Sequence, residues 1–200
     1  MHQNKIDVAI IGSMGSGKST IAKKLSEILG YSLFEESFET NPWLEPYYQD
    51  PEKFALPNEL WFLREKSKQH LNIALTPNST IQDSPLQSVP LLSEAMYKCR
   101  QFHEQEYQLF LDIFDYVRRL TPSPSIIIKL DVDTPIILER IKSRARQMEK
   151  DVDEAYIQNS VDIIKNAKFN IPYITIDGNS DPDTITNDII QHLKELKKIP

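Results

Sequence analysis

The chain has 200 residues and a formal net charge of −6, from 23 basic and 29 acidic side chains. This length suffices for one domain with a proper core, and the acidic balance argues against a general nucleic-acid or membrane surface. A single cysteine excludes an internal disulfide, and no run of about 18 apolar residues predicts a membrane-spanning helix. We therefore expect residues 1–200 to form one cytoplasmic domain, with no nucleic acid and no membrane among its partners.

Five apolar stretches predict strands, and segments with helical periodicity separate them. The predicted strands cover residues 6–11, 31–35, 80–82, 126–130 and 173–176. The predicted helices cover residues 19–29, 52–75, 88–97, 102–120, 135–146, 154–167 and 183–198. This alternation predicts a parallel sheet covered by helices on both faces, with ligands at the carboxyl ends of its strands. Chemistry is therefore expected at residues 12–19, at Glu35 or Glu36, and at Asp83.

The first predicted strand leads into a loop that fits the phosphate-binding pattern G-x-x-x-x-G-K-[ST]. Its glycines allow backbone N–H groups to form an anion nest, and the following helix adds a partial positive charge. Lys18 is then placed to reach the β- and γ-phosphates, and the Ser19 hydroxyl to hold Mg²⁺. The expected nucleotide-binding residues are Gly12, Ser13, Met14, Gly15, Ser16, Gly17, Lys18, Ser19 and Thr20.

The other motifs indicate a small-molecule kinase among the phosphate-binding classes. The Asn-Lys-x-Asp motif of a GTPase does not follow a late strand, and the fourth predicted strand ends in Asp131 and valine instead of the Asp-Glu of a mechanical ATPase. The segment 140–150 carries Arg140, Arg144 and Arg146, whose guanidinium groups suit phosphate oxygens. We interpret it as an arginine-bearing lid, the alternative being a solvated basic helix face without a ligand.

Four segments together resemble a known family. They read GSMGSGKST at 12–20, FEESFETNPWLEPYYQDPEKFALPNELWFL at 34–63, IQDS at 81–84 and RIKSRARQME at 140–149. With them the chain resembles the deoxynucleoside kinase family, in particular its bacterial deoxyadenosine/deoxyguanosine kinase branch. The resemblance implies a three-layer α/β P-loop kinase fold with a five-stranded parallel sheet, usually as a homodimer. It also implies transfer of the γ-phosphoryl group of ATP, with Mg²⁺, to the 5′-hydroxyl of a small-molecule deoxynucleoside, with purines favoured.

The resemblance assigns roles to individual residues. Glu36 matches the family glutamate that acts as general base beside the attacking 5′-hydroxyl. Tyr48 and Glu149 match groups that contact the sugar 3′-hydroxyl, and Asp83 matches an acid that holds Mg²⁺ or its waters. The lid arginines match those that neutralise charge on the transferred phosphoryl group. A solvated acid remains the alternative for Glu36 and Glu149, and an ordinary half-buried aromatic residue for Tyr48.

Two positions depart from the family pattern. Ser84 stands where the family has an arginine that braces the catalytic glutamate, and Arg64 and Lys66 are candidate substitutes. Glu59 stands where the family has a glutamine that pairs with the nucleobase, although an ionised glutamate only accepts hydrogen bonds. Lys66 also matches a base-contacting arginine of some members and shares a helical face with Glu59. The two either belong to the substrate pocket or face solvent.

These observations support three hypotheses. The favoured one is a Mg²⁺- and ATP-dependent kinase that acts on a nucleoside hydroxyl. The second keeps the kinase chemistry but changes the small-molecule acceptor, because Glu59 and Lys66 differ from the family pattern. The third is a nucleotide-binding module with weak or no catalysis, because Ser84 replaces the bracing arginine.

Overall fold

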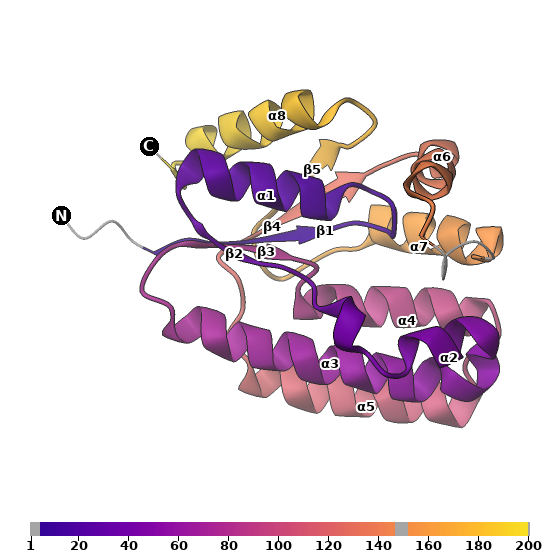
Figure 1. Cartoon of the computed structure of the whole chain (residues 1–200). Coiled ribbons are helices and arrows are strands. Elements are labelled where there is room, and N and C mark those ends of the chain that lie inside the picture. Colours follow the sequence, from indigo (N-terminus) through magenta and orange to yellow (C-terminus); the bar gives the residue numbers. More distant parts are fainter. Residues whose placement is uncertain (1–4, 147–151, 200) are drawn as a thin grey trace.

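The computed structural model describes residues 5–146 and 152–199 (Figure 1). Its centre is a five-stranded sheet in the order β2-β3-β1-β4-β5, and all neighbouring strands are parallel. The strands are β1 (Asp7–Ile11), β2 (Ser32–Phe34), β3 (Thr80–Asp83), β4 (Ile126–Asp131) and β5 (Tyr173–Asp177). The predicted α/β class and the five-stranded parallel sheet are therefore confirmed.

Helices cover both faces of this sheet. The helices are α1 (Lys18–Leu29), α2 (Leu44–Gln49), α3 (Pro51–Leu75), α4 (Val89–Lys98), α5 (Glu104–Leu120), α6 (Thr134–Arg144), α7 (Glu154–Asn166) and α8 (Pro182–Glu195). Figure 1 shows α1 and α8 on one face, and α3, α4, α5 and α7 on the other. Among the described helices, none combines the length and apolar character that crossing a membrane requires. The short helix α2 is absent from the predicted elements, since six residues with an internal proline show no helical period.

The central strand β1 is buried on both faces. Val8 and Ile10 pack in the main hydrophobic core, whereas Ala9 and Ile11 pack in a second cluster with Ile164 of α7. A parallel strand covered on both faces needs a continuous apolar run, which is the pattern of this segment. The strand therefore holds the loop that follows it in a fixed place at the carboxyl edge of the sheet.

Helix α3 carries two charged residues into the interior. The helix begins at Pro51 and is capped by Asp50, whose carboxylate accepts a hydrogen bond from the backbone N–H of Lys53 at 3.3 Å. Glu59 and Lys66 are only 3% and 5% exposed, so the alternative that they face solvent is wrong. Burial of both groups is possible because each finds polar partners in the adjoining elements, as described below.

The chain that follows β3 is fixed to α3 by His70. The ring of His70 accepts a hydrogen bond at Nε2 from the backbone N–H of Leu86 at 3.0 Å, so Nδ1 carries the proton and donates it to the carbonyl oxygen of Pro122 at 2.8 Å. Burial lowers the pKa of His70, which favours this neutral form. The turn that contains Ser84 is thereby held beside Lys66.

Candidate active site

The phosphate loop joins β1 to α1 and packs closely against α6. Gly15 and Gly17 have φ values of +80° and +93°, and a Cβ atom on Gly15 would lie 2.8 Å from Cγ1 of Ile141. Glycine is therefore required at position 15 both for conformation and for space. The Nζ atom of Lys18 donates to the carbonyl oxygen of Ser13 at 3.0 Å. Burial lowers the pKa of Lys18, and the nearby carboxylates of Asp83 and Glu36 oppose that effect.

A partly buried ion pair connects the ends of β2 and β3 to α3. The ammonium group of Lys66 lies 2.5 Å from Oε1 of Glu36 and donates to the carbonyl oxygen of Ser84 at 2.6 Å. Ser84 adopts a left-handed conformation with φ of +59°. Of the two candidate substitutes for the missing arginine, Lys66 takes this place, whereas the side chain of Arg64 is 68% exposed and pairs with Glu65.

The ion pair sets the charge state of Glu36. Burial disfavours its ionisation, but the ammonium groups of Lys66 and Lys18 outweigh burial and hold the pKa of Glu36 below its ordinary value. Glu36 is thus a carboxylate that is ionised, positioned by a cation and still open to the cavity. An ionised and positioned carboxylate can orient a hydroxyl, and it can receive the proton late in a loose transition state.

Asp83 lies at the end of β3 beside the first turn of α1. Its Oδ2 atom accepts a hydrogen bond from the hydroxyl of Ser19 at 2.5 Å, while the buried Oδ1 atom has no hydrogen-bond partner among the described residues. Burial raises the pKa of Asp83, and the charge of Lys18 counteracts this. An oxygen pair of this kind fits a small divalent cation, although the described residues contain no cluster of three or more His, Cys, Asp or Glu side chains.

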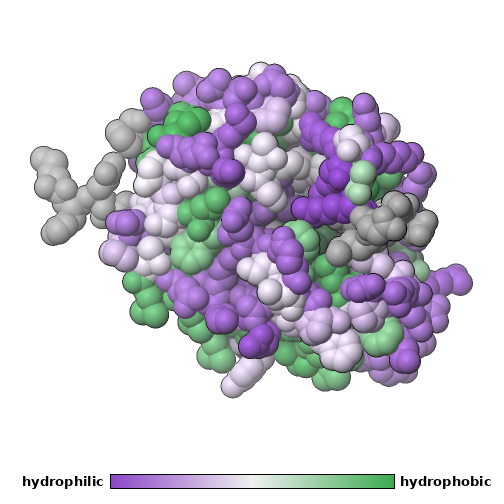
Figure 2. Space-filling model, in the orientation of Figure 1, coloured by the Kyte–Doolittle hydropathy of each residue, from purple (hydrophilic) through white to green (hydrophobic). Residues whose placement is uncertain are grey.

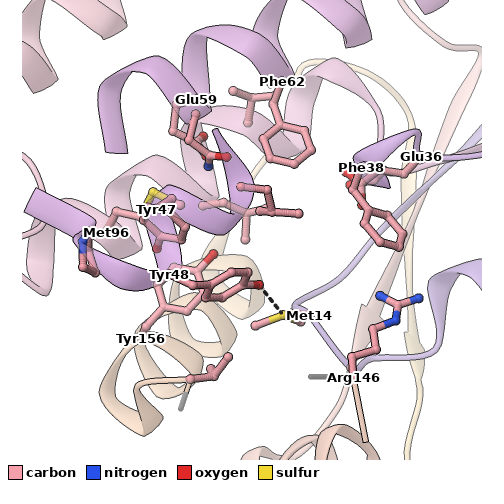
Figure 3. Close-up of a pocket in the computed structure, with 18 of the residues that line it drawn as sticks. Met14, Glu36, Phe38, Tyr47, Tyr48, Glu59, Phe62, Met96, Arg146 and Tyr156 are labelled. Atoms are coloured by element: carbon pink, nitrogen blue, oxygen red, sulfur yellow. Dashed lines mark hydrogen bonds between the residues drawn. The ribbon is translucent and has the colours of Figure 1, made fainter. Parts of the chain in front are cut away.

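One cavity extends from the phosphate loop to α4 (Figure 3). Among the predicted residues, its lining includes Lys18, Glu36, Tyr48, Glu59 and Lys66. It also includes residues that are not among the predicted site residues, namely Phe38, Tyr47, Phe62, Met96, Gln101 and Tyr156. Five of them are apolar or aromatic, which is equally typical of core packing, and Gln101 lies in none of the motifs identified above.

The deep end of the cavity is formed by Glu59 of α3. The carboxylate accepts hydrogen bonds from the hydroxyl of Ser93 at 2.7 Å and from Nδ2 of Asn58 at 3.2 Å. Burial raises the pKa of Glu59 to about 7. The hydrogen bonds from Ser93 and Asn58 and the charge of Lys66 lower this pKa, but burial outweighs them. Figure 3 shows Glu59 and Met96 on the opposite side of the cavity from Glu36.

The lid arginines separate into two groups. Arg144 and Arg146 line the cavity, and the guanidinium carbon of Arg146 lies 4.5 Å from the ring centroid of Phe38. Arg140 instead donates to three backbone carbonyl oxygens, those of Ser16 at 3.3 Å, Gly178 at 3.0 Å and Ser180 at 3.3 Å. Arg140 therefore ties the phosphate loop to the turn after β5.

Of the two residues expected to contact the sugar, Tyr48 and Glu149, only Tyr48 lies in the part of the chain that the structure describes. Tyr48 lines the cavity, and its hydroxyl donates to the sulfur atom of Met14 in the phosphate loop at 3.7 Å (Figure 3). Glu149 lies outside the described residues. The position of Tyr48 between the loop and the deep end fits a contact with the middle of a nucleoside.

The family model for deoxynucleoside kinases matches residues 8–198. The chain belongs to the deoxynucleoside kinase family. It is 29% identical to a deoxyadenosine kinase of Dictyostelium discoideum over 76% of this chain and 62% of that protein. It is 25% identical to a deoxyguanosine kinase of Bacillus subtilis over 94% of this chain and 96% of that protein.

A solved structure has the same architecture. The deoxyadenosine kinase from M. mycoides with the products dCMP and dCDP superposes with a TM-score of 0.87 at 29% identity, covering 95% of this chain and 100% of the other. The same enzyme has also been solved with bound dATP, with a TM-score of 0.86. The predicted family and the class of nucleoside kinase, a phosphotransferase that acts on a hydroxyl group, are therefore confirmed.

Replacement of Lys66 by methionine tests the electrostatic link to Glu36. Because the ammonium group lowers the pKa of Glu36, its removal raises that pKa, and the acid limb of the kcat/KM profile moves to higher pH. Initial rates of phosphoryl transfer between about pH 5 and about pH 9 measure this shift. Lys68→Met is the matched control, since that side chain is 63% exposed and lies 3.9 Å from Glu65. An acid limb that stays in place in Lys66→Met contradicts the assignment.

Proposed function

We propose that residues 1–200 form one kinase domain that transfers the γ-phosphoryl group of ATP to the 5′-hydroxyl of a deoxynucleoside. The observation that carries this proposal is the single cavity that runs from Lys18 past Glu36 to Glu59. It offers a site for phosphates, a base for a hydroxyl and an enclosed polar group for a nucleobase, in that order. The family membership and the nucleotides bound to the M. mycoides enzyme support a nucleotide-binding kinase site.

In the proposed reaction, Glu36 orients the 5′-hydroxyl toward the γ-phosphorus of ATP. The oxygen forms a bond to phosphorus while the bond between the γ-phosphorus and the β–γ bridging oxygen breaks, and ADP leaves. The hydroxyl proton passes to the carboxylate of Glu36. Lys66 is a positioning residue, because it holds this carboxylate in place and keeps it ionised.

The donor nucleotide occupies residues 12–20 in this proposal. Lys18 and the loop amides bind the phosphates, and Arg144 and Arg146 neutralise the charge that moves with the phosphoryl group. Arg140 acts indirectly by fixing the carbonyl oxygen of Ser16. Tyr48 and Glu149 are assigned to the sugar 3′-hydroxyl, on the resemblance and, for Tyr48, on its place in the cavity.

Mg²⁺ is proposed as the cofactor, held by Ser19 and Asp83. The Oδ1 atom of Asp83, which has no hydrogen-bond partner within residues 5–146 and 152–199, and the adjacent hydroxyl of Ser19 supply the hard oxygen ligands that this ion takes. When bound, the ion supplies positive charge beside the phosphates.

The presence of Lys66 beside Glu36 argues against a non-catalytic module. That hypothesis arose because Ser84 replaces a bracing arginine, and Lys66 of α3 provides the missing cation.

A homodimer is proposed through the outer face of α3 and α5. Large apolar side chains are exposed there, namely Leu71, Leu75, Leu109, Tyr116 and Leu120. Figure 2 shows hydrophobic side chains along the lower edge of the molecule, where Figure 1 places these two helices. Several large apolar side chains exposed on one face are typical of a protein interface.

The catalytic assignment is tested by Glu36→Gln. Glutamine keeps the shape but cannot accept a proton, so we expect kcat to fall by about 10²- to 10⁴-fold while the affinity for ATP changes little. Phosphoryl transfer from radiolabelled ATP to a panel of deoxynucleosides and ribonucleosides measures the effect. Glu35→Gln is the control, because Glu35 is exposed and contributes only its backbone oxygen to a bond from Gln69. Equal turnover in the two variants removes Glu36 from the role.

The metal assignment is tested by Asp83→Asn. We expect this variant to bind ATP with Mg²⁺ more weakly than the wild type and to lose less affinity for ATP in excess chelator, because only the metal contact weakens. Isothermal titration calorimetry with and without Mg²⁺ measures the affinity for the Mg²⁺–ATP complex and the affinity for ATP alone. Asp131→Asn, at the end of β4 and 3.3 Å from Lys165, is the matched control. The assignment fails if both variants respond to Mg²⁺ as the wild type does.

The dimer proposal predicts that a charge on the apolar face separates the subunits. Tyr116→Glu, at a side chain that is 69% exposed, introduces an unpaired carboxylate into the proposed interface. Analytical ultracentrifugation at micromolar concentration is expected to give a monomer for this variant and a dimer for the wild type. Ile28→Glu on α1, at 59% exposure on the other face, is expected to leave the dimer intact. A monomeric wild type refutes the proposal.

A further inference from the structure

Glu59 occupies the part of the cavity where a nucleobase would lie. It is 3% exposed, and it shares the cavity lining with the flat or apolar side chains of Phe62, Met96 and Tyr156 (Figure 3). A polar group buried in such surroundings dictates which partner can approach, because an unmatched donor or acceptor stays unpaired there. The question is which hydrogen-bonding pattern this carboxylate presents to a base.

A chain of amides fixes one side of the carboxylate. The backbone N–H of Trp43 donates to Oδ1 of Asn41 at 2.9 Å, which leaves Nδ2 of Asn41 to donate to Oδ1 of Asn58 at 2.8 Å. Nδ2 of Asn58 therefore points at Oε1 of Glu59, at 3.2 Å. If the side-chain amide of Asn41 or Asn58 were rotated by 180°, donor would face donor or acceptor would face acceptor. The protein thus presents a donor to this oxygen of Glu59.

The second oxygen also has one protein donor. Oε2 of Glu59 accepts from the hydroxyl of Ser93 at 2.7 Å, and that hydroxyl lies 2.9 Å from the carbonyl oxygen of Val89 as well. Each oxygen of a carboxylate has two lone-pair sites, so each keeps one for a ligand. In its ionised form Glu59 therefore offers two adjacent acceptors and no donor.

The charged and titratable groups around Glu59 are compatible with an anion. Lys66 from α3 supplies positive charge, Glu36 beyond β2 supplies negative charge, and Tyr47 and Tyr156 from α2 and α7 carry neutral phenols whose pKa values burial raises. Burial raises the pKa of Glu59 to about 7, so a slightly alkaline solution favours the carboxylate. A ligand that donates two hydrogen bonds favours it further.

Only one common nucleobase matches two adjacent acceptors. Guanine carries N1–H and the 2-amino group next to each other on its Watson–Crick edge, whereas adenine and cytosine present a donor beside an acceptor there. A glutamine at this position, as in the family pattern, presents a donor and an acceptor. We propose, on the basis of the kinase function above, that Glu59 selects guanine and that deoxyguanosine is the acceptor nucleoside.

The proposal is tested by Glu59→Gln, which replaces one carboxylate oxygen by an amide group. Glu59→Gln can keep both protein contacts, because Ser93 can donate to Val89 and accept from the new amide while Asn58 donates to the new carbonyl oxygen. We expect the ratio of kcat/KM for deoxyguanosine over deoxyadenosine at about pH 8 to fall by about 10- to 100-fold. Deoxyinosine lacks the 2-amino group, so its kcat/KM with the wild type is expected to be about tenfold lower than that of deoxyguanosine. With Glu59→Gln, we expect no such difference between the two nucleosides.

Glu94→Gln is the matched control, since Glu94 follows Ser93 on α4, is 40% exposed and pairs with Lys98. It is expected to keep the wild-type ratio. A wild type that prefers deoxyadenosine, or a ratio that Glu59→Gln leaves unchanged, overturns the inference. Calorimetric binding of the same three nucleosides reads the preference without turnover. Absence of transfer to all nucleosides therefore refutes the proposed function, while the binding ratio still decides the role of Glu59.

Discussion

The contact on which the site depends is the one that the ammonium group of Lys66 makes with Glu36 and Ser84. It joins α3 to the chain just beyond β2 and β3, and the side chain of Lys66 that makes it is only 6% exposed. Without the cation, the partly enclosed carboxylate of Glu36 would take up a proton more readily. With the cation in place, the carboxylate remains ionised and faces the cavity next to the phosphate loop.

The same helix therefore contributes to both ends of the substrate cavity. Two turns separate Lys66, which supports the group that accepts a proton, from Glu59, which lies where a base would bind. Because α3 is a rigid element anchored by a cap at Asp50 and by His70, the spacing between the two ends is fixed by the fold. Loops alone would not hold two such groups at a defined separation.

The sequence was sufficient where the signal is local, and insufficient where packing decides. The phosphate loop follows from its own spacing, and the strands follow from apolar runs. The choice between Arg64 and Lys66 does not follow from the sequence, because both lie on α3 and only the packing of this helix in the fold decides which one turns inward. Arg140 and Arg144 share a helical face, yet Arg140 is drawn to Ser16 and Gly178, which are distant in the chain. The roles of Tyr48 and Glu149 and the cytoplasmic location stay predictions.

The location of the bracing cation on a helix also limits how the chain can diverge. Positions 66 and 84 both face Glu36, and that carboxylate can neutralise only one buried cation. An arginine at position 84 would place a second cation beside Glu36, and together with a cation at 66 it would need a second anion such as Asp83, whose charge interacts with that of Lys66. The charge at position 84 therefore has to be judged together with the charges at 66 and 83, because all three lie around the same carboxylate.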